Sequence, residues 1–198
     1  MRFSSACLTL LGISLTASPA AGQWSAGLEV GADRYWGGST ETGTEHRSFR
    51  PYRPTTFGIR VERSGSRVGF GFQAHYAEAG LALEGDGAVA TVEGVFTIVS
   101  LSPEMIYQLA TLGPSNQLRL HAGPLFEVWT IIDEDSQTRF GFQGAVSLDI
   151  PLGSRFSGSI IAGAALTPSP FEVGQLGPGF APRALWRRRF AAGVEYRL

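Results

Sequence analysis

The segment Val68-Gly-Phe-Gly-Phe-Gln-Ala-His-Tyr76 decides the fold of this chain of 198 residues. Apolar side chains occupy every second position, and glycine, Gln73 and His75 fill the positions between them. A period of two residues is the signature of a β-strand with two unlike faces. We therefore predict a strand with one bulky apolar face and one small or polar face.

The same alternation returns in seven further segments, and no comparable helical period is found after residue 22. The eight predicted strands cover residues 24–36, 57–61, 68–76, 95–109, 118–128, 140–150, 156–166 and 186–198. Short connections at 64–65, 110–116 and around Gly153 alternate with longer ones at 37–54, 77–94, 132–138 and 168–183. An even number of strands with alternating short and long connections predicts an antiparallel up-and-down β-barrel, the organisation of transmembrane barrels.

The register of two short hairpins can be predicted from the requirement that apolar residues face apolar residues. A turn centred on Ser64-Gly65 pairs Val61 with Val68. In the following short hairpin, the same rule pairs Tyr107 with Leu120. The same register sets Pro103 opposite Pro124 inside the two strands. Because proline has no backbone N–H to donate to the ladder, we predict either a bulge or weak pairing between the two strands at this point.

The orientation of the apolar face separates two kinds of barrel. A soluble barrel of lipocalin type would be apolar inside, whereas a membrane barrel is apolar outside. Glycines lie mostly on the polar face, which suits the narrow interior of eight strands. Trp24 and Trp36 share the apolar face twelve residues apart, or roughly 30 Å along a tilted strand, close to the membrane band with its aromatic girdles. We therefore predict that the apolar face meets lipid.

The N-terminus carries the pattern of an export signal. Met1-Arg2 gives a positive start, residues 6–17 form an apolar run, and Ala20-Ala-Gly22 supplies small residues before a cleavage site. The apolar run is too short to span a bilayer. We predict a signal peptide at 1–22, with a soluble N-terminal helix as the alternative, and a barrel domain at 23–198.

The C-terminal segment Phe190-Ala-Ala-Gly-Val-Glu-Tyr-Arg-Leu198 resembles the C-terminal signature of Gram-negative outer-membrane proteins. Leu198 stands where that signature usually has phenylalanine. From Gln23 to Leu198 the pattern resembles the small eight-stranded barrels of the OmpA transmembrane-domain and OmpX type. This resemblance implies an outer-membrane location, short periplasmic turns, longer extracellular loops, recognition by the barrel assembly machinery and a monomeric state.

Charged residues at inward positions of the predicted strands are equal in number for the two signs. The acids are Glu29, Asp33, Glu62, Glu104, Glu127, Asp149 and Glu195, and the arginines are Arg60, Arg67, Arg119, Arg155, Arg187, Arg189 and Arg197. Because unpaired buried charges are costly, we predict a lumen plugged by paired charges. The alternative is a narrow ion path through this network.

Arg47, Arg50 and Arg53 recur every third residue beside two prolines. A polyproline II segment would place them on one side. Strand closure would bring Arg183 and Arg188 near the same loop. Since arginine suits phosphate, we predict contact of this cluster with lipopolysaccharide or another anion, against the alternative of solvated loop charges.

A protruding hairpin is also predicted outside the membrane. Leu81-Ala-Leu83 and Val89-Ala-Thr-Val92 flank Gly85-Asp-Gly87, a turn sequence between two alternating runs. Such a hairpin could pair with a partner strand or simply be a tall ordered loop.

No pattern in the sequence points to catalysis, a metal or a cofactor. His46, His75 and His121 have no neighbouring nucleophile or carboxylate at a recognised spacing. The net charge of −1 gives no sign of the basic surface that nucleic-acid-binding proteins use. We therefore predict a non-enzymatic outer-membrane barrel with a structural or surface-interaction role. The alternatives are a narrow channel or transporter for small hydrophobic or ionic solutes, and an outer-membrane lipid-modifying enzyme.

Overall fold

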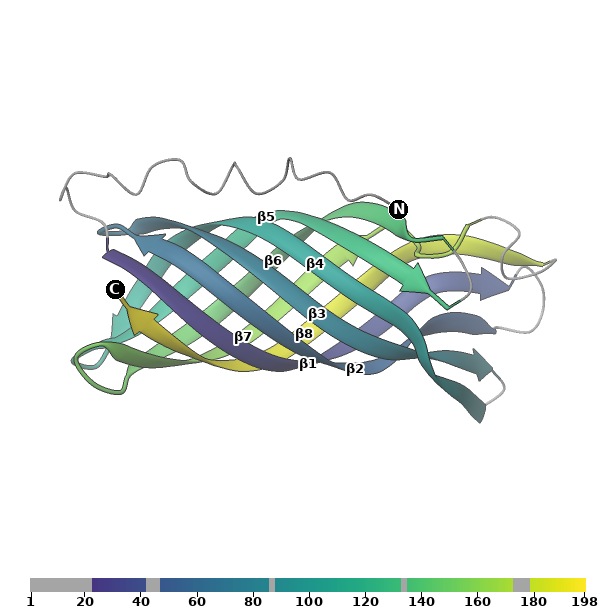
Figure 1. Cartoon of the computed structure of the whole chain (residues 1–198), viewed down its shortest axis with the longest axis horizontal. Coiled ribbons are helices and arrows are strands. Elements are labelled where there is room, and N and C mark those ends of the chain that lie inside the picture. The colour runs from purple at the N-terminus through teal and green to yellow at the C-terminus, as the bar shows by residue number, and fades with distance from the viewer. Residues whose placement is uncertain (1–22, 42–46, 86–87, 133–134, 173–178) are drawn as a thin grey trace, which may run out of the picture.

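The computed structural model describes residues 23–41, 47–85, 88–132, 135–172 and 179–198, so the predicted signal peptide lies outside the described residues. Eight antiparallel strands follow one another around a closed barrel, and β8 pairs with β1 (Figure 1). The strands are β1 (Gln23–Glu41), β2 (Ser48–Ser64), β3 (Val68–Gly85), β4 (Ala88–Leu112), β5 (Asn116–Ile131), β6 (Gln137–Pro151), β7 (Phe156–Thr167) and β8 (Phe180–Arg197). The predicted up-and-down barrel is confirmed. Within these ranges, no helix is long and apolar enough to cross a membrane.

The apolar face points outward. Leu28, Phe142 and Phe190 are 69%, 75% and 67% exposed, whereas Glu29, Arg189 and other charged residues of the alternate positions are buried inside. A soluble barrel would have the opposite arrangement, so the lipocalin-type alternative is wrong. The exposed aromatic and aliphatic side chains form the kind of surface that hydrocarbon covers.

The two predicted registers had different outcomes. The β4–β5 prediction is confirmed, because Tyr107 pairs with Leu120 and Leu101 with Phe126. The β2–β3 prediction is wrong, because Val61 pairs with Phe72 and not with Val68. The turn contains the hydrogen bond from Gly65 N to Val68 O, so its centre lies further along the chain than predicted. The slip is an even number of residues, which leaves every side chain on its predicted face.

Several segments predicted as loops are strand. The β3–β4 ladder continues from Leu81↔Val92 to Gly85↔Ala88, so the paired strands of the predicted hairpin are confirmed, whereas residues 86–87 of its predicted turn lie outside the described residues. β1 and β2 likewise extend beyond their predicted ends, whereas β7 ends at Thr167. We call the end of the barrel with the β2–β3, β4–β5 and β6–β7 connections the turn end and the opposite end the loop end.

The two facing prolines interrupt the β4–β5 ladder without a bulge. Paired residues flank Pro103 and Pro124 on both sides in one unbroken register. Ser102 Oγ donates a hydrogen bond of 2.7 Å to the Pro124 carbonyl. A Cβ at Gly123 would lie 2.0 Å from the Pro103 carbonyl oxygen, so only glycine fits this close approach of backbones.

Candidate functional site

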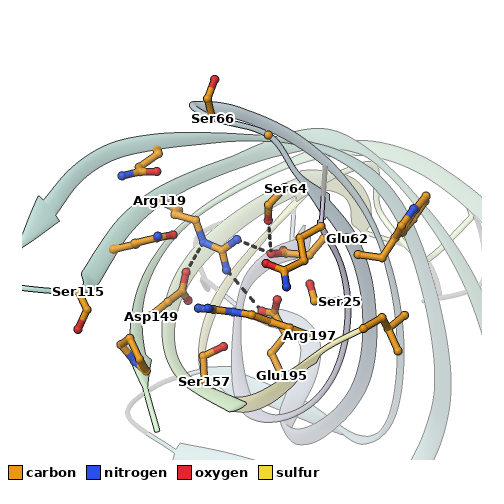
Figure 2. A pocket seen from close by; sticks show the side chains of 17 residues that line it. Ser25, Glu62, Ser64, Ser66, Ser115, Arg119, Asp149, Ser157, Glu195 and Arg197 are labelled. Atoms are coloured by element: carbon orange, nitrogen blue, oxygen red, sulfur yellow. Dashed lines mark hydrogen bonds and ion pairs between the residues drawn. The ribbon is translucent and has the colours of Figure 1, made fainter. Parts of the chain in front are cut away.

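The lumen is filled by layers of side chains, and the first layer at the turn end is organised by Arg119 of β5. Its guanidinium forms ion pairs with Glu62 of β2 and Asp149 of β6, and Nη2 lies 3.5 Å from Glu195 Oε2 of β8 (Figure 2). Arg119 thus ties together four strands of the barrel wall. One guanidinium thus contacts three carboxylates.

An open vestibule of about 860 Å³ leads from the turn end to this layer. Ser25 and Arg197 line it together with Arg119 and its three carboxylate partners (Figure 2). Arg119 is only 6% exposed although the vestibule is wide. The arginine layer therefore closes the inner end of the vestibule.

A second charged layer occupies the middle of the lumen. Arg189 Nε donates a hydrogen bond of 2.9 Å to Asp33 Oδ1, and Arg60 Nη2 lies 3.2 Å from Glu29 Oε2. His75 bridges the two pairs, because its ring nitrogens contact Glu29 and Arg189.

The same charged layer extends to β5 through a second arginine of β8. Arg187 Nη1 of β8 donates a hydrogen bond of 2.8 Å to Glu127 Oε1 of β5 and lies 4.0 Å from Asp33 Oδ2. Arg187 and Glu127 are both buried. Interlocked opposite charges and hydrogen bonds offset the desolvation of these groups.

Beside these layers lies a constellation that sequence reasoning missed. His121 Nδ1 lies 3.2 Å from Glu104 Oε2, and His121 Nε2 lies 2.9 Å from Ser147 Oγ. This is the order of contacts of a serine, histidine and acid triad. The residues are 17 and 26 positions apart along the chain. Their only sequence signal is that all three occupy inward positions.

The loop end of the lumen is closed by an apolar cluster rather than by charges. Trp129 is fully buried and packs edge to face against Tyr35 and Phe96, with ring centroids 6.0 Å and 5.8 Å apart. Ile98, Leu185 and Phe171 belong to the same cluster, together with two alanines of β3. The prediction of a lumen plugged by paired charges therefore holds for the turn end and the middle of the lumen. It is wrong for the loop end, which apolar side chains close.

Two of the predicted lumen residues lie outside the network. Arg67 and Arg155 are exposed beside the short turns, and Arg155 Nη1 donates a hydrogen bond to Tyr196 Oη. Their positions at strand ends let the long side chains reach solvent. Of the other predicted arginines, Arg197 is half-buried in the vestibule.

The polyproline II interpretation of the arginine cluster is wrong, because Arg50 and Arg53 belong to β2. Arg50 Nε forms an ion pair of 2.9 Å with Glu84 Oε2 of β3. Arg53 has a φ of 35° beside a ladder irregularity, and its guanidinium lies over the Tyr52 ring. Arg47 precedes β2, and its carbonyl accepts a hydrogen bond from Glu41 N.

The two arginines of β8 have separate surroundings. Arg183 lines an open cavity of about 930 Å³ between β6 and β8, above the end of β7. Arg188 lies on the outer wall with its guanidinium 4.7 Å from the Trp36 ring centroid. The five predicted anion-binding arginines thus occupy different environments.

A closed eight-stranded barrel with a lipid-compatible outer face and a filled polar lumen defines a fold of the outer-membrane type. No protein-family model matches the chain, and no curated protein matches it in sequence. Solved structures do match. Neisserial surface protein A shares 11% identity over 88% of this chain and 97% of its own, with a TM-score of 0.61.

Two other solved barrels give the same result. A major outer membrane protein from Thermus thermophilus shares 15% identity over 88% of this chain and 99% of its own, with a TM-score of 0.52. The N-terminal β-barrel domain of OprF from Pseudomonas aeruginosa shares 14% identity over 89% of this chain and 99% of its own, with a TM-score of 0.51. The resemblance to small outer-membrane barrels is confirmed at the level of the fold.

Proposed function

We propose that this chain is a non-enzymatic outer-membrane β-barrel whose lumen is closed and whose activity lies at its outer surface. The observation that carries this proposal is the closure of the lumen beyond the turn-end vestibule by the Arg119 layer, the Arg189 layer and the Trp129 cluster. An eight-stranded barrel leaves little space beyond its own side chains. What remains available to partners is the turn-end vestibule, the lipid-facing wall and the strands that extend at the loop end.

The export and orientation of the chain belong to the same proposal. Residues 1–22 act as a cleaved signal peptide, and the barrel assembly machinery inserts residues 23–198 as a monomer. The short turns face the periplasm and the loop end faces outward, as is general for outer-membrane barrels. Trp24 near the turn end and Trp36 near the loop end, both exposed on the outer wall, support this placement across the bilayer.

A closed lumen predicts the absence of ion conductance. Reconstituted into planar bilayers, the chain is expected to give no discrete current steps, because the charged layers hold their own counter-ions and the Trp129 cluster excludes water. The measurement is single-channel recording, with a general porin inserted into the same bilayers as the positive control. Reproducible current steps from the purified monomer would support the channel alternative and contradict the closed-lumen proposal.

The triad-like contacts of Ser147 make a lipid-modifying enzyme the second candidate. Two observations weigh against it. His121 and Ser147 are both 0% exposed, and both residues pair with the strands on either side of them, so their own backbone amides are engaged in the ladder rather than free to form an oxyanion hole. The simpler interpretation is that the three side chains form a buried hydrogen-bonded bridge between β4, β5 and β6 and have a structural role.

The enzyme candidate can be tested directly on the serine. We expect a fluorophosphonate probe to leave the folded chain unlabelled, because it cannot reach Ser147 Oγ. Expression of the parent and of Ser147→Ala is expected to give identical lipid A mass spectra. Labelling that disappears in Ser147→Ala, or lipid products seen only with the parent, would show that the serine is catalytic.

A further inference from the structure

Two arginines face each other on the outer wall of the barrel. Arg34 of β1 and Arg188 of β8 are direct partners in the closing ladder, and both side chains are exposed. Like charges directly opposite each other on a sheet face destabilise the pair. No ion pair of either arginine with an acid is found within the described ranges 23–41, 47–85, 88–132, 135–172 and 179–198. The geometry therefore leaves two adjacent positive charges for an external anion.

The arginine pair is bordered by a tryptophan pair. Trp36 and Trp186 are the next outward-facing partners of the same ladder, on the loop-end side, and they are 45% and 53% exposed. The guanidinium of Arg188 lies over the Trp36 ring. Indole rings favour the membrane interface, where one edge is apolar and the other is wet.

The position of the pair corresponds to the level of lipid head groups. On its turn-end side the next outward partners are Ala32 and Phe190, which begin the apolar band. From β2 to β5 outward polar residues appear as successive ladder partners, Thr55, Glu78, Thr97 and Thr130, whereas on β7 the partner of Arg188 is the apolar Ala164. A long arginine side chain at this boundary can reach the head-group layer while its stem stays in hydrocarbon.

We propose that Arg34 and Arg188 bind a phosphate group of the phosphorylated glycolipid of the outer leaflet, the lipid A part of lipopolysaccharide. Two guanidiniums offer forked donors to the phosphate oxygens, and the flanking indoles pack against the sugar and the upper acyl chains. This inference rests on the proposed outer-membrane location. It differs from the cluster expected from the sequence: Arg188 is kept, Arg34 is added, and Arg47, Arg50, Arg53 and Arg183, which lie in other surroundings, are left out.

The test compares Arg34→Gln/Arg188→Gln with a matched control, Arg63→Gln. Arg63 is the ladder partner of Trp24 at the turn end, with its guanidinium 5.9 Å from the Trp24 ring, so the control removes a similar arginine at the opposite interface. The full chain, purified from outer membranes in mild detergent, is titrated with hexa-acylated lipid A and bound lipid is counted by native mass spectrometry. We expect affinity to fall about tenfold or more in the double variant, equivalent to about 1.4 kcal/mol, and less than about twofold in the control.

Two further probes separate the lipid from a free ion. Bis-dephosphorylated lipid A is expected to bind the parent as weakly as intact lipid A binds the double variant, and millimolar inorganic phosphate is expected to leave lipid binding nearly unchanged. Equal binding of intact and dephosphorylated lipid, or equal losses in the double variant and the control, would overturn the site. Displacement of the lipid by inorganic phosphate alone would overturn the lipid assignment. None of these outcomes bears on the closed lumen, which conductance tests separately.

Discussion

Replacing Arg119 with methionine is expected to lower the free energy of unfolding by about 3–5 kcal/mol, the range for removing one partner of a buried ion pair. The side chain holds Glu62, Asp149 and Glu195 from three different strands. Methionine has a similar stem but no charge, so the three carboxylates would lose the cation that they share. The measurement is reversible urea unfolding of the barrel in lipid bilayers, followed by tryptophan fluorescence.

Two variants decide whether the loss comes from uncompensated charge. Arg155→Met removes an exposed arginine beside a turn, and its effect is expected to stay within about 0.5 kcal/mol. Adding Glu62→Gln and Asp149→Asn to Arg119→Met is expected to restore part of the lost stability, because most of the unpaired negative charge disappears. If the triple variant is less stable than Arg119→Met alone, the carboxylates stabilise the fold in another way.

The strand pattern could be predicted because lipid and lumen impose opposite demands on alternate residues. That is why Phe70 and Gln73 were assigned to the correct faces, and why the β4–β5 register followed from pairing Tyr107 with Leu120. The β2–β3 register, by contrast, could not be predicted from the pattern. An even slip keeps apolar opposite apolar, so the pattern alone does not distinguish Val68 from Phe72 as the partner of Val61.

The lumen contacts were harder to predict because they depend on how the strands are staggered around the barrel. Inward positions were identified from alternation, but their level along the axis follows from the register of every ladder. The Ser147, His121 and Glu104 contacts therefore had no local signal. The balance of acids and arginines made paired charges a sound prediction, whereas the arrangement of the pairs around Arg119 required the closed structure.

The apolar cluster at the loop end illustrates a second limit. Phe96 and Trp129 occupy inward positions, but inward positions were expected to be small or polar. Above the lipid band the outer wall no longer needs to be apolar. A barrel can there use an interior hydrophobic core like that of a soluble protein. The alternation of inward and outward side chains continues through this region, but here the inward side chains are the apolar ones.

Truncating Trp129 to alanine is the most direct test of this loop-end core. The indole is 0% exposed and contacts the rings of Tyr35 and Phe96, and its Nε1 donates a hydrogen bond of 3.2 Å to Glu127 Oε2. Loss of a large buried aromatic residue typically costs about 3–5 kcal/mol, through lost burial and a residual cavity. We expect urea unfolding of Trp129→Ala to show a loss in that range.

The outward-facing Trp186 provides the matched control, since Trp186→Ala deletes the same side chain at a position that is 53% exposed. Its loss should be clearly smaller, because no enclosed cavity forms and lipid or head groups can fill the space. Trp129→Ala should also remain non-conducting, because the Arg189 and Arg119 layers beneath it still occlude the lumen. Conductance in this single variant would mean that the apolar cluster alone closes the barrel and that the charged layers admit ions. Equal losses at the two tryptophans would mean that the loop-end cluster is not a packed core.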